Sequence, residues 1–321
     1  MSLKPAAAHR YADHIQSLGR SSHKDVRSIF NLHVKGPWPK IASLPANQVT
    51  GVQIANMMRR LALNGKGRTA NKLRSYIRAA FQVARSWRSR ASVPEHFRFF
   101  EVVHNPAMDT EPDEGQNRSA KRPLTADELR LYWQSIRNLN SFKGAVLRLH
   151  LLTGGQRIAQ LVRLRTQDID RAAFKIYDGK GRPGKPPRAH FVPLIPDAAK
   201  ALKDCKPAGG YALSTDGGET HIAPTTLSAW AQEVAEEIPD FKAKRIRSGV
   251  ETILASARVN SDTRGHLQSH GISGVQARHY DGYDYLTEKR EALETLLALL
   301  NQPIVALEIH QENCIEEHST D

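Results

Sequence analysis

The sequence has few of the features that mark secreted, membrane-spanning or disulfide-stabilised proteins. Its 321 residues include two cysteines, Cys205 and Cys314, which excludes a disulfide framework and a cysteine-built zinc site. No apolar run approaches the roughly 18 residues of a membrane span, and the first 20 residues lack the apolar core of a secretory signal. We therefore expect a cytoplasmic protein with no membrane partner.

Motifs for nucleotide and metal cofactors are absent as well. The turn over residues 179–185 resembles a phosphate-binding loop, but Pro186 follows its last lysine, where that motif needs Ser or Thr. Residues 179–184 also read Gly-x-Gly-x-x-Gly, but two prolines follow them in place of the helix that this motif opens. The sequence contains no His-Glu-x-x-His, and its histidines are not spaced as a ligand set. We therefore expect neither a cofactor nor a metal.

Acidic residues are scarce in the first third of the chain. Residues 1–100 hold 18 Lys and Arg against three acids, and no acid lies between Asp25 and Glu95. The first 100 residues carry a charge of +15 and the remaining 221 carry −2, for a formal net charge of +13. A basic module joined to a nearly neutral one predicts binding to a polyanion.

One helix of the basic third is expected to present four arginines on a single face. Apolar residues recur at three- and four-residue steps over residues 70–90, which predicts a helix with one buried face. At about 100° per residue, four arginines fall within an arc of about 80° opposite that face. Their forked donors can meet successive phosphates. The predicted phosphate-binding residues are Arg74, Arg78, Arg85 and Arg88.

Shorter helical patterns surround this helix and predict a four-helix unit. They cover residues 10–18, 24–33 and 48–63, and two prolines flanking Trp38 predict a loop over 36–40. The helical domain is expected to span residues 1–108. A polar, acidic composition without periodicity predicts a flexible linker over 109–120.

The second domain is expected to span residues 121–300, followed by a tail over 301–321. Thr125 and Glu128 are spaced as a capping box at its first helix. Two short strands, over 174–178 and 189–194, flank the Gly- and Pro-rich turn and predict a hairpin. The other helices are expected over 130–138, 145–152, 224–237, 248–258 and 284–300. The predicted fold class is therefore mainly α with a small β-hairpin, an α+β protein of two domains.

The second domain also carries an ordered series of basic residues that ends in a histidine and a tyrosine. Its members are Arg157 after the turn Thr153-Gly-Gly, Lys180 in the hairpin, Lys244 and Arg247 in Lys-Arg-Ile-Arg, His270 before Gly271, and Tyr280. In this order and spacing they resemble the catalytic residues of the tyrosine recombinases, the phage-integrase family of site-specific DNA recombinases. The resemblance covers nearly the whole chain, and residues 121–290 carry most of it.

The resemblance implies a role for each residue. Arg157 and Arg247 match the two arginines that neutralise the phosphodiester. Tyr280 matches the nucleophile, whose 3′-phosphotyrosyl ester keeps the bond energy, so that neither ATP nor metal is needed. Lys180 is the implied general acid for the departing 5′-oxygen, and His270 would bind the phosphate or take the tyrosine proton.

Two positions depart from the family pattern. Lys244 stands where the family usually has histidine, and a lysine can still donate a hydrogen bond to phosphate. Gln160 stands where an acidic residue commonly supports the arginine, and an amide supplies no countercharge. We expect altered pH behaviour from the first.

The resemblance also implies the fold and the partners. A helical core-binding (SAM-like) domain and a catalytic domain would form a C-shaped clamp around double-stranded DNA. Strand exchange needs a homo-tetramer on paired recombination sites, with a monomer or weak oligomer free in solution and the tail contacting a neighbouring protomer. Accessory DNA-bending proteins are further partners of such enzymes. The implied setting is a bacterial or phage-encoded, nucleoid-associated protein that integrates or excises a phage or mobile genetic element.

Several alternatives stay open on the sequence. Tyr283 or Tyr285 could replace Tyr280 as nucleophile, and His266 could replace His270. The chain could be a DNA-binding relative that has lost cleavage. It could also be a type IB topoisomerase, which shares the tyrosine and arginine chemistry but needs no partner protomer. A covalent adduct with DNA separates an enzyme from the binding protein, and dependence on paired sites separates a recombinase from a topoisomerase.

Overall fold

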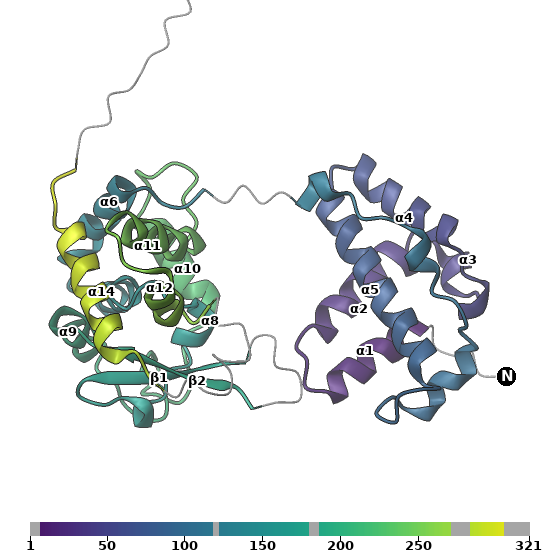
Figure 1. Ribbon diagram of the computed structural model, residues 1–321, viewed down its shortest axis with the longest axis horizontal. Helices are drawn as coiled ribbons and strands as arrows, with labels where there is room; N and C mark the ends of the chain where they lie inside the picture. The colour runs from purple at the N-terminus through teal and green to yellow at the C-terminus, as the bar shows by residue number, and fades with distance from the viewer. Residues whose placement is uncertain (1–6, 118–121, 180–185, 271–282, 305–321) are drawn as a thin grey trace, which may run out of the picture. The chain divides into compact units, whose positions relative to one another are not determined.

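The computed structural model of the chain describes residues 7–117, 122–179, 186–270 and 283–304. Residues 7–117 belong to one compact unit, and residues 122–179, 187–270 and 283–304 belong to another (Figure 1). Each unit has a hydrophobic core of its own.

The described part of the N-terminal unit is helical. Its α-helices are α1 (Ala7–Ser17), α2 (His23–Phe30), α3 (Pro39–Ala42), α4 (Gly51–Leu63) and α5 (Gly67–Ser86), with a π-helical turn at Asn31–Lys35 and 3-10 turns at Ala46–Gln48, Glu95–Phe100, Pro106–Asp109 and Glu114–Asn117. Helix α5 packs against α1, α2 and α4. It buries Leu73, Ile77 and Ala80, because apolar side chains at three- and four-residue steps share one face of a helix. The four helices predicted for this unit are therefore present.

Most helix boundaries in this unit differ from the prediction by a few residues, and two of the differences change how a segment is interpreted. The expected loop over 36–40 contains the start of α3, because Pro39 occupies the first helical position, where its missing N–H costs nothing. Helix α5 ends at Ser86, not at residue 90, and turns follow it. Arg88 therefore lies beyond the end of the helix that was expected to carry it.

The segment predicted to be a flexible linker packs against α5 over part of its length. Asn71 and Asp113 exchange two hydrogen bonds: the Asn71 amide donates to the Asp113 carbonyl at 2.7 Å, and the Asp113 N–H donates to Asn71 Oδ1 at 2.9 Å. Arg74 donates to the carbonyl and hydroxyl oxygens of Thr110. Side chains of α5 thus bind backbone groups of this segment, which its polar composition could not predict.

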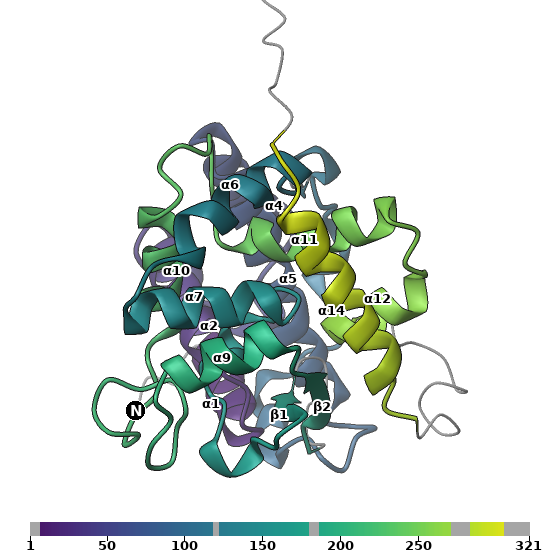
Figure 2. The same ribbon diagram turned by 90° about the vertical axis from the view of Figure 1, so that its left-hand side faces the viewer.

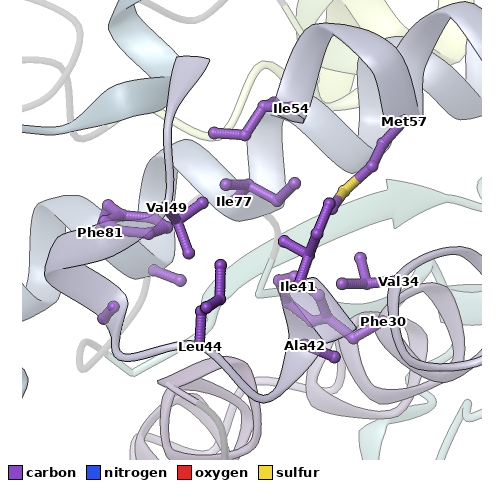
Figure 3. A pocket seen from close by; sticks show the side chains of 12 residues that line it. Phe30, Val34, Ile41, Ala42, Leu44, Val49, Ile54, Met57, Ile77 and Phe81 are labelled. Atoms are coloured by element: carbon purple, nitrogen blue, oxygen red, sulfur yellow. The ribbon is translucent and has the colours of Figure 1, made fainter. Parts of the chain in front are cut away.

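A small apolar cavity lies in the core of the N-terminal unit (Figure 3). Its lining includes Phe30, Ile41, Met57 and Phe81, and every one of the lining side chains is apolar. The cavity offers no polar group that could orient a ligand, so it belongs to the packing of the core.

The second unit combines helices with one two-stranded sheet. Its elements are α6 (Ala126–Arg137), α7 (Phe142–Leu152), α8 (Ile158–Leu161), β1 (Ala173–Asp178), β2 (Arg188–Pro193), α9 (Pro196–Asp204), α10 (Pro224–Glu233), α11 (Lys244–Ser256), α12 (Ser261–Gln268) and α14 (Leu286–Leu300), with a 3-10 turn at Thr166–Asp168. The strands pair antiparallel, with Ile176 opposite His190 and Asp178 opposite Arg188. The predicted α+β class is confirmed. Helices α9 and α12 were not predicted.

Helix α7 is central to this unit, and α14 closes one side of it. Helix α7 packs against α6, α9 and α10, and its residues from Gly144 to Leu152 are buried. Helix α14 packs against α6, α11, α12 and β2 (Figure 2). Helix α11, which carries Lys244 and Arg247, and helix α12, which precedes His270, are thereby packed on the same core.

The predicted capping box is confirmed, and it also fixes the orientation of α11. The Thr125 N–H donates to Glu128 Oε2 at 2.8 Å, and the Glu128 N–H donates to Thr125 Oγ1 at 3.1 Å. The Glu128 carboxylate pairs with the buried Arg245 at 2.9 Å. Since residues two apart on a helix point about 200° from each other, this pair directs Arg247 to the other side of α11.

Candidate active site

A turn of two left-handed glycines brings the two predicted catalytic arginines together. The φ angle is 84° at Gly154 and 63° at Gly155, a region that glycine adopts without strain. A Cβ on Gly155 would lie 2.9 Å from the Cα of Arg247, a contact that is too close for any other residue. Helix α11 can therefore lie against the turn that leads into Arg157, which is the N-cap residue of α8.

Arg247 is held by backbone carbonyls that flank the site. Its guanidinium donates to the Gly155 carbonyl at 3.3 Å and to the Gln268 carbonyl. The buried Gln268 amide in turn donates to the carbonyls of Gly154 at 3.0 Å and Arg247 at 2.8 Å. Burial, followed by repulsion from Arg157, lowers the pKa of Arg247 to about 10. Arg247 therefore stays charged at neutral pH, and an anion bound between the two guanidiniums would relieve their repulsion.

Arg157 contacts a carboxylate that the sequence analysis did not identify. Its Nη1 lies 3.1 Å from Asp178 Oδ2 and 3.1 Å from the Ser269 carbonyl oxygen. The Gln160 amide donates to Asp178 Oδ1 at 2.7 Å. The Gln160 amide supplies no countercharge to Arg157, and Asp178 supplies one. The signal that could have found it is its place in the sequence, as a charged strand residue two positions before Lys180.

His270 lies beside Arg247 in a polar setting. Its Nε2 lies 3.1 Å from Gln268 Oε1 and 3.6 Å from Glu251 Oε2. Burial, then the charge of Arg247, lowers the pKa of His270 below its usual value, and Glu251 opposes this shift. His270 is therefore neutral at pH 7 and has a nitrogen lone pair that can take a proton.

The alternative residues, His266 and Tyr283, belong to an aromatic cluster next to α14. The His266 ring stacks on Tyr285 with centroids 3.8 Å apart, and Tyr283 meets Tyr285 edge-on at 5.0 Å. Tyr283 is 57% exposed. His270, in contrast, lies within the field of Arg247 and Arg157.

Of the remaining predicted catalytic residues, the structure describes Lys244 alone. Lys244 is exposed and begins α11, one turn before Arg247 and so on the same side of the helix. Lys180 and Tyr280 lie outside the described residues, as does the tail beyond residue 304. Strand β1 ends two residues before Lys180.

The four predicted phosphate-binding arginines are not equivalent. Arg78 and Arg85 are exposed on α5, seven residues apart and so on one face. Arg74 is half-buried, and its Nε donates to the Thr110 carbonyl at 3.1 Å. Arg88 lies beyond the helix, with its guanidinium 5.7 Å from the centre of the Trp87 ring.

The described ranges contain neither a metal-ligand cluster nor a helix that could cross a membrane. In residues 7–117, 122–179, 186–270 and 283–304, no three His, Cys, Asp or Glu side chains are grouped as metal ligands. None of the helices in the same ranges combines the length and apolarity that crossing a membrane requires.

Solved structures of integrases share the fold of this chain over most of its length. A lambda integrase (residues 75–356) dimer bound to a COC′ core site is 18% identical, with a TM-score of 0.60, and the match covers 86% of this chain and 97% of that one. The Tn1549 transposon integrase (residues 82–397) in complex with circular intermediate DNA is 16% identical, with a TM-score of 0.62, and the match covers 90% and 99%.

A lambda integrase tetramer bound to a Holliday junction is 20% identical, with a TM-score of 0.60, and the match covers 87% of this chain and 76% of that one. No family model and no curated protein matches the sequence. At these identities the likeness shows the fold alone, and that fold is the one that the sequence resemblance implied.

Proposed function

We propose that this chain, whose fold is that of the tyrosine recombinases, is a site-specific DNA recombinase that works through a tyrosine nucleophile. The observation that carries the proposal is the pairing of Arg157 and Arg247 at the glycine turn, with a neutral His270 beside Arg247. Two crowded, permanently charged guanidiniums provide forked donors for a single phosphate. A neutral imidazole at their edge can accept the proton of an attacking hydroxyl.

In the proposed reaction, the hydroxyl oxygen of Tyr280 forms a bond to phosphorus while the bond to the 5′-oxygen breaks. His270 takes the proton of the tyrosine, and Lys180 gives a proton to the departing 5′-oxygen. Arg157 and Arg247 stabilise the charge on the non-bridging oxygens, with Lys244 as a further donor one turn along α11. The resulting 3′-phosphotyrosyl ester keeps the bond energy. A 5′-hydroxyl from the partner strand can then reverse the step without ATP or metal.

Double-stranded recombination sites are the proposed partner. The basic N-terminal unit supports this partner, because Arg78 and Arg85 are exposed on one face of α5 and no acid lies between Asp25 and Glu95. The similar integrases were solved on DNA, one of them as a tetramer on a Holliday junction. We therefore propose a tetramer on paired sites, in the nucleoid of a bacterial cell. The proposed role is the integration or excision of a phage or mobile element.

Covalent capture on a nicked suicide substrate tests the proposed function. The substrate carries sequence from the ends of the genetic element that encodes the protein, and loss of the short 5′-hydroxyl fragment traps the ester. We expect a DNA adduct with the wild-type chain and with Arg163→Ala, an exposed arginine six residues from Arg157, but none with Arg247→Ala. Binding without any adduct would favour the non-catalytic relative. Relaxation of supercoiled DNA that lacks paired sites would favour a topoisomerase.

A further inference from the structure

One buried carboxylate connects its own strand to side chains from two other segments of the candidate site. Asp178 ends β1 and is 7% exposed. Its Oδ2 lies 3.1 Å from Arg157 Nη1 and accepts the Ser269 hydroxyl at 3.1 Å. Its Oδ1 accepts the Gln160 amide at 2.7 Å. The same side chain thus connects the start of α8, the residue before His270, and the strand that leads to Lys180.

The charge of this carboxylate matters because cations surround it. Besides Arg157, the Arg188 guanidinium reaches Ser269 Oγ at 2.6 Å, and Asp178 is close enough to Arg247 to oppose the fall in the pKa of that group. Arg157 donates to Asp178 and to the Ser269 carbonyl through the same atom, Nη1. Its Nη2 and Nε are therefore available for the phosphate that the proposed function requires.

We infer that Asp178 is the positioning residue for Arg157: its negative charge sets the direction of the guanidinium and couples it to β1 and to Ser269. This inference rests on the proposed function and extends it to a residue that does not touch the DNA. Since the Gln160 side chain reaches within 2.7 Å of the same carboxylate, a carboxylate at position 160 can occupy nearly the same place beside Arg157. The negative charge should therefore be transferable between the two positions.

The test moves the negative charge from position 178 to position 160 and measures the rate of covalent-complex formation and the affinity for a half-site. Asp178→Asn keeps the shape of the side chain and removes its charge, Gln160→Glu adds a charge, and the double variant moves it. We expect Asp178→Asn to slow covalent-complex formation at least about 10-fold, with half-site affinity within about twofold of wild type. The double variant should recover the rate to within about threefold. Asp197→Asn, an exposed acid on α9 of the same unit, is the matched control and should change neither quantity.

Thermal unfolding of the same variants needs no catalysis. Asp178→Asn should lower Tm, because it leaves Arg157 without its buried partner. Gln160→Glu alone should lower Tm through repulsion between two carboxylates, and the double variant should recover most of the loss. If Asp178→Asn does not fold, the double variant decides whether the charge matters, because a charge restored at position 160 should restore folding.

The outcomes separate the inference from the proposed function. Cleavage by Asp178→Asn at the wild-type rate, or a double variant that recovers neither rate nor Tm, would overturn the positioning role. If the wild-type chain forms no covalent complex, the proposed function fails. The Tm values of the two single variants and the double variant then decide whether Asp178 carries the charge that orients Arg157.

Discussion

The backbones of Gly155 and Arg247 approach so closely that a Cβ on Gly155 would stand 2.9 Å from the Arg247 Cα. The contact joins the turn before Arg157 to α11. The Gly155 carbonyl also accepts a hydrogen bond from the Arg247 guanidinium at 3.3 Å. The spacing between the two arginines is therefore set by a glycine that has no chemistry of its own.

Gly155→Ala should cost more stability than another left-handed glycine does. A methyl group at this position meets the α11 backbone, and the left-handed backbone adds strain. We therefore expect a loss of about 2–4 kcal/mol in the free energy of unfolding. Gly217→Ala is the control, because Gly217 has a φ of 77° with nothing within 4 Å of its added Cβ. It should lose only about 1 kcal/mol. If denaturant titrations give the two variants equal losses in the free energy of unfolding, the contact with α11 does not add to the destabilisation.

Replacing Arg157 or Arg247 with lysine should impair cleavage almost as much as alanine does. A lysine keeps the charge but cannot make two parallel contacts with the phosphate. We expect alanine variants to lose at least about 10²-fold in the rate of covalent-complex formation, the usual scale for a lost oxyanion donor. Single-turnover kinetics on a suicide substrate measure this. A lysine variant at the wild-type rate would reduce the role of the residue to charge alone.

Local sequence patterns predicted much of the framework of this site. The capping box at Thr125 is present because its two partners lie three residues apart. Strands β1 and β2 begin within one residue of the expected positions, because alternation and the Gly- and Pro-rich turn are local signals. The glycine turn before Arg157 was recognised in the same way.

Contacts between distant segments could not be predicted from those patterns. Asp178 reaches Arg157 because the packing of α8 on the sheet brings the end of β1 beside it. The engagement of Arg74 by Thr110 depends on how residues 106–117 fold back on α5. Neither a helical period nor a motif reports such a contact, so the four predicted phosphate-binding arginines are equivalent by sequence alone.

The arginines of the N-terminal unit should therefore divide into two classes. Arg78→Ala and Arg85→Ala should each lower the slope of log affinity against log salt by about one, because each removes a phosphate contact. Arg74→Ala should lower the stability of the unit, since it frees the Thr110 carbonyl, and should change the slope less. Fluorescence anisotropy with a DNA half-site over a salt series, together with thermal unfolding, separates the classes. An unchanged slope in the Arg78 and Arg85 double variant would show that this face does not bind DNA.

Two buried histidines should make the catalytic unit less stable in acid. Burial lowers the pKa of His150 to about 4 and that of His190 to about 3. Between pH 7 and 5 the unfolded chain gains protons on these histidines, and the folded chain does not. The free energy of unfolding should therefore fall with pH by about 2 kcal/mol for each histidine. His190→Gln, which can keep the hydrogen bond to the Leu267 carbonyl, should remove about half of this dependence. A wild-type stability that is flat from pH 7 to 5 would contradict the assignment.

The most direct test of the account is to identify the residue that becomes joined to DNA. The covalent complex formed on a suicide substrate is digested with protease and nuclease, and the peptide that carries the nucleotide is sequenced by mass spectrometry. The account predicts a phosphotyrosyl bond at Tyr280, lost in Tyr280→Phe with half-site binding retained, and kept in Tyr283→Phe. A nucleotide on Tyr283 would move the nucleophile, and a wild-type chain that binds its sites without forming any adduct would contradict the proposed chemistry altogether.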